Sequence, residues 1–119
     1  MTTQPVCAFA FEKDPDSRVM IVSLTGKLDP VAAEDLTPRL EEALKAGTRR
    51  FVFDLSRLVY VGSMGLRLFV GLSNRVRGEG GVALSSPTPA VLTILDMTKL
   101  DRVLRHYPTR HEAIDALSV

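Results

Sequence analysis

The sequence predicts a single domain of the α/β class, and three observations support this prediction. The chain has 119 residues, which is the usual length of one domain. Short apolar runs alternate with longer segments that carry one apolar stripe each, in the order ββαβαβα(β)α. Turn-forming residues alone separate the first two strands, whereas helical segments separate the later ones. We therefore expect one domain over residues 1–119, ordered over about 6–118, with a mixed, mostly parallel sheet, an antiparallel N-terminal edge strand and about four flanking helices.

Two apolar stretches predict the N-terminal hairpin. Cys7, Phe9 and Phe11 alternate with smaller or polar residues, which is typical of a strand with one buried face. Residues 18–25 are nearly continuous in apolar and β-branched side chains, which indicates a strand covered on both faces. Residues 13–17 between them are dense in turn formers and join the two strands.

The first helix is predicted over residues 31–46. Asp29 followed by Pro30 is a strong helix start, because aspartate caps unpaired N–H groups and proline is tolerated at the first helical position. Pro38 is expected to kink or restart this helix, and Gly47 to end it. The apolar stripe consists of residues spaced by four: Leu36, Leu40 and Leu44.

The middle of the chain predicts a strand, a loop and a second helix. Residues 51–55 form the third strand, and a separate apolar patch at 58–61 follows in the loop. Residues 64–77 form the second helix, which the glycines of 78–81 end. The predicted stripe of this helix is Leu68, Leu72 and Val76, with Phe69 beside it.

The remaining elements are short. Residues 82–84 form a buried strand, and Thr88 before Pro89 starts a short helix. Residues 102–107 are a candidate edge strand, and a capping box at 109–112 starts the last helix.

Composition excludes several classes of function. Fifteen basic residues stand against 14 acidic ones, so the chain lacks the basic excess of a general nucleic-acid or anionic-membrane binder. Cys7 is the only cysteine, which rules out an internal disulfide and a cysteine-based zinc site. No spacing of metal-ligating residues suggests a metal or cofactor. The N-terminus does not resemble a signal peptide, and no apolar run approaches the roughly 18 residues of a membrane helix. We expect a cytoplasmic domain without membrane insertion.

Ser63 is the main candidate for a functional residue, because it lies between an apolar segment and a helix. One interpretation is an N-cap, whose oxygen accepts an N–H of the first turn. The other interpretation is a phosphorylation site at the same position. A phosphate is well tolerated near unpaired N–H groups and the positive end of the helix dipole. The two interpretations are compatible.

A nucleophilic serine is a weaker hypothesis. The elbow of a serine hydrolase has the pattern G-x-S-x-G, but Val61 occupies the place of the first glycine. Neither His106 nor His111 is spaced as its base would be. We therefore expect no enzyme.

Three segments together resemble the STAS domain, the family of anti-sigma factor antagonists and sulfate-transporter tails. They are GKLDP, FVFDLSRLVYVGSMGLRLF and GVALSSPTPAVLTILDMTKLDRVLRHYPTRHEAIDAL, and the similarity runs in order over nearly the whole chain. The resemblance implies a STAS-like fold and a non-enzymatic switch. In such antagonists a serine-kinase anti-sigma factor binds around the S-x-G-L step, phosphorylation of the serine releases it, and a phosphatase resets the cycle.

The resemblance also implies roles for particular residues. By position Ser63 is the phosphate acceptor, and the partner-binding surface comprises Asp29, Gly62, Met64, Gly65, Leu66 and Arg67. The family pattern D-S-S-G-L is G-S-M-G-L here. Gly62 thus stands where the family has an acidic residue, and Met64 where it has a second serine. If exposed, Met64 would instead offer an apolar contact.

We expect the first of three functions, and the other two are its alternatives. The first is an anti-sigma factor antagonist, a monomer or weak dimer that regulates sigma-factor-dependent transcription with an anti-sigma factor and a phosphoserine phosphatase as partners. The second is a STAS regulatory subunit of a transporter or signalling complex that binds without phosphorylation, which the missing acidic neighbour favours. The third is an enzyme or small-ligand binder that uses Ser63.

Overall fold

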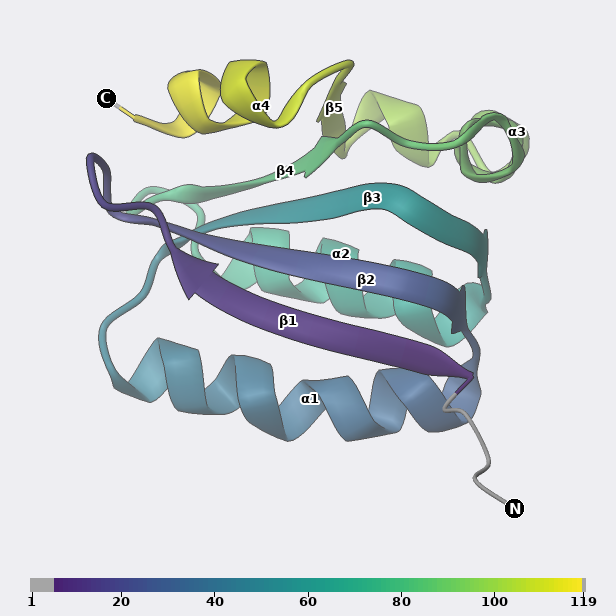
Figure 1. The fold of residues 1–119 in the computed structure, drawn as a ribbon, viewed down its shortest axis with the longest axis horizontal. Coiled ribbons are helices and arrows are strands. Elements are labelled where there is room, and N and C mark those ends of the chain that lie inside the picture. The colour runs from purple at the N-terminus through teal and green to yellow at the C-terminus, as the bar shows by residue number, and fades with distance from the viewer. Residues whose placement is uncertain (1–5, 119) are drawn as a thin grey trace.

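The computed structural model describes residues 6–118, so the first five positions and the last one of the predicted domain lie outside the description. The sheet has five strands in the order β1-β2-β3-β4-β5 (Figure 1). β1 pairs with β2 in antiparallel orientation, and every other neighbouring pair is parallel. This arrangement confirms the predicted fold class. The strands are β1 (Cys7–Lys13), β2 (Val19–Leu28), β3 (Arg50–Val61), β4 (Gly81–Ser85) and β5 (Arg105–Tyr107).

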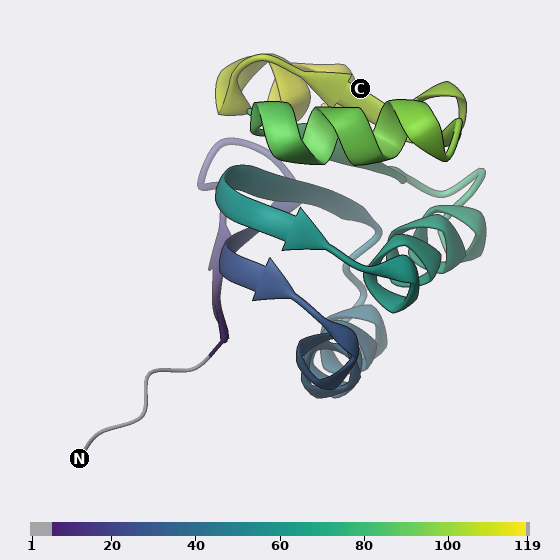
Figure 2. The same cartoon turned by 90° about the vertical axis from the view of Figure 1, so that its right-hand side faces the viewer.

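Helices cover both faces of the sheet. α1 and α2 lie side by side on one face (Figure 2), and α4 packs on the other face against β2, β3 and β4. α3 packs beside the second half of β3, where the Thr88 hydroxyl donates to the Leu58 carbonyl at 2.8 Å. The helices are α1 (Pro30–Lys45), α2 (Ser63–Arg75), α3 (Pro89–Met97) and α4 (Arg110–Leu117), with a 3-10 turn at Leu100–Arg102.

The central strands are buried on both sides, as the apolar run 18–25 predicted. Val22 of β2 and Phe53 of β3 belong to the core beneath α1 and α2. Ile21 and Val52, one position earlier, belong to the smaller core beneath α4. Successive side chains of a strand point to opposite faces, so two covered faces require a continuous apolar run.

β3 is longer than predicted. The patch 58–61 is not part of a loop, because Leu58 pairs with Gly26 and Val61 with Leu28 in the same parallel ladder. Two register shifts lie in this stretch, between Ser23 and Thr25 and between Gly26 and Lys27. They interrupt the regular alternation of side chains, which is why the sequence pattern suggested a break.

Two details of the helices differ from the prediction, although Leu72 and Val76 of the predicted α2 stripe and Phe69 beside it are buried. α1 runs as one helix through Pro38 instead of restarting there, and Pro38 lies on its exposed side. In α2 the side chain of Leu68 is only half-buried, whereas Leu66 is buried at 6% exposure. The sheet-facing side of α2 therefore consists of Gly65, Leu66, Phe69 and Leu72.

No helix within residues 6–118 has the length and apolar character that a membrane span requires.

Candidate functional site

The site predicted around Ser63 lies where β3 passes into α2. The N-cap of α2 is Gly62, without a side-chain hydrogen bond, and Ser63 is the first helical residue. The prediction that Ser63 is itself the N-cap was therefore wrong by one position. Its side chain is exposed, at the end of the helix where backbone N–H groups lack intrahelical partners. The hydroxyl group thus stands at the surface and takes no part in capping.

A backbone hydrogen bond brings the Asp29 loop beside this step. The N–H of Gly62 donates to the carbonyl of Leu28 at 3.0 Å, which ties the end of β3 to the end of β2. Asp29 follows directly and caps α1, since its Oδ1 accepts from the N–H of Ala32 at 2.8 Å. The N-cap role predicted for Asp29 is confirmed, and α1 and α2 begin next to each other.

Gly65 sets how closely α2 approaches the sheet. A Cβ atom at this position would lie 2.7 Å from Cδ2 of Leu28 and 2.9 Å from Cγ2 of Val61. Both neighbours are buried side chains at the ends of β2 and β3. The first turn of α2 can therefore rest directly on the two strands only because residue 65 has no side chain.

The residues predicted to contact a partner fall into two groups. Met64, 47% exposed, and Arg67 present their side chains at the surface. Gly62, Gly65 and Leu66 are buried and support the step from beneath. A partner that docks on this conformation would meet the first group and depend on the second only indirectly.

Two exposed apolar residues near this step were not predicted from the sequence. Val31, in the first turn of α1, is 66% exposed, and Tyr60, near the end of β3, is 45% exposed. The Tyr60 hydroxyl lies 3.3 Å from the place that a Cβ of Gly62 would occupy. The only sequence signal for Tyr60 was its place in the apolar patch 58–61, to which no exposed or functional role was assigned.

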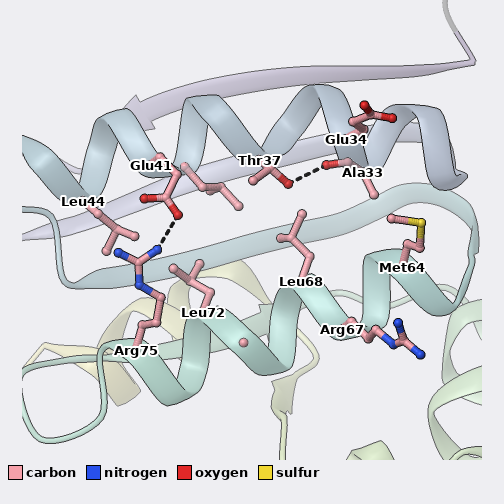
Figure 3. Close-up of a pocket in the computed structure, with 12 residues that line it drawn as sticks. Ala33, Glu34, Thr37, Glu41, Leu44, Met64, Arg67, Leu68, Leu72 and Arg75 are labelled. Carbon is pink, nitrogen blue, oxygen red and sulfur yellow. Dashed lines mark hydrogen bonds and ion pairs between the residues drawn. The ribbon is translucent and has the colours of Figure 1, made fainter.

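An apolar groove runs between α1 and α2 beside the site (Figure 3). Its volume is about 380 Å³. Leu68 and Leu72 point from α2 toward α1, while Arg67 points away from α1 (Figure 3). We call this feature the α1–α2 groove; its walls are residues 33–44 of α1 and 64–75 of α2.

A second hollow, of about 460 Å³, lies on the other flank of α2. Ser63 and Leu100 line it, and Arg67 and Gly71 line both this hollow and the α1–α2 groove. The exposed ridge of α2 therefore carries Ser63, Arg67 and Gly71 at successive spacings of four residues.

A separate polar cluster centres on Arg110 at the start of α4. Its guanidinium donates to Asp54 at 2.6 Å, to Glu12 at 3.0 Å and to Ser23 at 3.3 Å, which joins α4 to β3, β1 and β2. Burial by itself raises the pKa of Asp54, but hydrogen bonds from Arg110 and Ser56 outweigh burial and hold this pKa below its usual value. The arrangement is an interaction between elements of the fold on the α4 face of the sheet.

The described residues offer little for metal or thiol chemistry. Within 6–118 no group of three or more histidine, cysteine, aspartate or glutamate side chains could hold a metal ion. Burial raises the pKa of the Cys7 thiol to about 11, so this group stays protonated and unreactive at neutral pH.

Comparison with known proteins identifies the family. The sequence profile described as "STAS domain" matches residues 10–113. The chain belongs to the STAS domain family.

Three similar proteins are named anti-sigma factor antagonists. An anti-sigma F factor antagonist of Paenibacillus polymyxa is 28% identical over 103 residues, which cover 85% of this chain and 88% of the relative. The crystal structure of an anti-sigma factor antagonist from Mycobacterium paratuberculosis is similar at a TM-score of 0.83 and 26% identity, covering 93% of each chain. The unphosphorylated form of the anti-sigma factor antagonist SpoIIAA is similar at a TM-score of 0.77 and 25% identity, covering 92% of this chain and 95% of that one.

Proposed function

We propose that this protein is an anti-sigma factor antagonist that binds a serine-kinase anti-sigma factor and is released when Ser63 is phosphorylated. It would thereby regulate sigma-factor-dependent transcription in the cytoplasm, without catalysing a reaction itself. A phosphoserine phosphatase would restore the binding form, and the free protein would be a monomer or weak dimer. The names of its relatives support the partner class.

The observation that carries the proposal is the exposed hydroxyl of Ser63 at the first position of α2. Phosphoryl transfer requires an accessible acceptor, and this hydroxyl is not engaged in capping. The Asp29 loop lies beside it, and Met64 and Arg67 are exposed on the same turn of the helix. The start of α2 therefore presents a hydroxyl that could accept phosphate beside an apolar and a charged side chain that could contact a partner.

Electrostatics explains how one phosphate would act as a release signal. Phosphorylation adds about −1.5 to −2 charges. A charge that is desolvated in an interface without a matching cation costs about 3–5 kcal/mol. Since about 1.4 kcal/mol corresponds to a tenfold change in affinity, binding would weaken by a hundredfold or more.

A second candidate function is a STAS regulatory subunit of a transporter or signalling complex that acts without phosphorylation. Gly62 and Met64 favour it, because the family pattern has an acidic residue and a second serine at these positions. In that case Met64 and the neighbouring apolar residues Val31 and Tyr60 would form a constitutive contact surface.

A binding and phosphorylation assay tests the proposal. Serine-kinase anti-sigma factors from the same organism are purified, and each is incubated with the protein and ATP. Mass spectrometry then maps phosphate, and titration calorimetry measures the affinity of wild type, Ser63→Ala and Ser63→Asp. We expect one kinase to phosphorylate Ser63, and Ser63→Asp to bind that kinase at least about a hundredfold more weakly than wild type.

Ser118→Asp is the matched control, because it adds the same charge at an exposed serine beyond α4. Phosphate at another residue, or equal affinity of Ser63→Asp and wild type, would refute the release switch. Binding of transporter components with no phosphate on Ser63 would favour the second candidate.

A further inference from the structure

The α1–α2 groove has the length and lining of a site for a helix. Its walls, residues 33–44 and 64–75, each extend about 17 Å, since a helix rises about 1.5 Å per residue. This length matches three turns of a bound helix. Buried leucines form its floor, namely Leu40, Leu44 and Leu72, and the half-buried Leu68 and exposed Met64 offer apolar surface above them. Grooves of this kind accept the apolar stripe of an amphipathic helix.

Gly71 is a second, independent observation. Glycine is a poor helix former, yet Gly71 lies in the interior of α2 on an exposed face. A Cβ atom there would meet nothing within 4 Å, so packing within the described chain does not require glycine at this position. Gly65 on the same helix contrasts with it, because neighbouring side chains exclude a Cβ there. The absence of a side chain at Gly71 allows the backbone of another helix to come close.

The charges along the groove indicate what kind of helix would fit. Glu34 and Glu41 line the α1 wall, and Arg67 and Arg75 line the α2 wall. Glu41 and Arg75 form an ion pair with both side chains largely exposed, so a competing partner can readily replace it. Glu34 and Arg67 form no ion pair with any residue in the range 6–118. The two walls therefore offer opposite charges to a ligand.

We propose that the α1–α2 groove binds an amphipathic helix of the anti-sigma factor, which crosses α2 at Gly71. Its apolar stripe lies over Leu68 and Met64, with basic side chains over α1 and acidic side chains over α2. Met64 and Arg67 line the groove and also lie in the first turns of α2, which begins at Ser63. The bound helix would therefore lie next to the proposed phosphate acceptor. The inference rests on the proposed function and adds the second part of the same interface.

Two substitutions of Gly71 test the proposal, one through the stability of the protein and the other through its affinity for the anti-sigma factor. Gly71→Ala should raise the melting temperature by about 4 °C, because alanine favours the helix and meets no clash. Gly71→Leu should weaken binding of the purified anti-sigma kinase by roughly tenfold or more, because its side chain fills the crossing point. Glu34→Lys should weaken binding through charge reversal on the α1 wall. Ala46→Leu, exposed at the end of α1 and outside the groove, is the matched control and should bind as wild type does.

Each outcome decides a separate point. If Gly71→Leu and Glu34→Lys bind like wild type while Ser63→Asp does not, the groove inference is wrong and the proposed function stands. If no purified kinase binds wild type, both fail. If sedimentation shows a dimer that Gly71→Leu dissociates, a second copy of the chain occupies the groove and the inference is overturned.

Discussion

Ser63 stands at the positive end of the α2 dipole with its side chain in solvent, one helical turn before the exposed Arg67. The helix dipole and the Arg67 side chain both favour a negative charge on this residue in the unbound chain. A negative charge at Ser63 is therefore compatible with the fold. We expect it to lower the affinity for a partner and not the stability of the unbound protein. This separation between stability and binding is what a release switch needs.

We predict that Ser63→Asp stabilises the unbound protein. A carboxylate in the first helical turn contributes about 0.3–1 kcal/mol, and a pair with Arg67 four residues later adds about 0.2–0.5 kcal/mol. Urea denaturation should show both gains, and the second should disappear in the double variant with Arg67→Ala. Destabilisation by Ser63→Asp would mean that loss of binding in this variant reflects damage to the fold.

Gly65 and Gly71 give a paired prediction on one helix. Gly65→Ala should destabilise the protein by about 1–2 kcal/mol, because its Cβ would overlap Leu28 and Val61 in a packed core. Gly71→Ala should stabilise it by up to about 1 kcal/mol, since nothing opposes the better helix former. Denaturant midpoints of the two variants check this, and a shift of the same sign in both would contradict it.

At the scale of elements, the helices start where their caps lie. The side chains of Asp29, Thr88 and Thr109 accept from the N–H groups of Ala32, Val91 at 3.4 Å and Glu112 at 3.1 Å, which confirms the three N-caps predicted from the sequence. α2 is the exception, since a glycine caps it without a side chain. Among the α-helices of residues 6–118, the one that begins at Ser63 is therefore the one whose N-cap offers no side-chain acceptor to its first N–H groups.

Pro38 provides the prediction for α1. It removes the hydrogen bond that its own N–H would donate to the carbonyl of Glu34, yet the helix continues because Leu36 and Leu40 anchor it on the core. Pro38→Ala should stabilise the protein by about 1–2 kcal/mol, the restored hydrogen bond exceeding the entropy that the unfolded chain regains. Thermal denaturation measures the effect. A lower melting temperature would show that proline is required at this position.

At the scale of the whole molecule, Arg110 connects α4 with strands far away in the sequence. Asp54 is its most enclosed partner, with a side chain 13% exposed, while that of Arg110 is 40% exposed. Because solvent screens the arginine, the pair contributes less than a buried pair would. It fixes the position of α4 on the sheet at one point, beside the apolar contacts of Ala113 and Leu117.

The lowered pKa of Asp54 sets the direction of a pH effect. A carboxyl whose pKa is lower in the folded than in the unfolded state stabilises the fold above its ordinary value of 3.8. This contribution is lost as the pH falls from there through the lower folded pKa. The unfolding free energy of Asp54→Asn should therefore decline less than that of wild type below pH 3.8, measured by urea titration. Equal slopes would show that Asp54 does not contribute to acid denaturation.

The sequence by itself determined the α/β class, the order of the elements, the antiparallel hairpin and the caps at Asp29, Thr88 and Thr109. These features depend on local periodicity and on side chains that bond to backbone groups a few residues away. The same kind of information directed attention to Ser63, although the resemblance to the STAS domain was needed to give it a role.

Only the tertiary structure decided the rest, because it depends on contacts between distant segments. The length of β3 follows from pairing with β2, and the burial of Leu66 and half-burial of Leu68 follow from where α2 meets the sheet and α1. The α1–α2 groove and the Arg110 cluster likewise join residues many positions apart. Local patterns specify which face of an element is apolar, but packing decides how much of that face remains open to a partner.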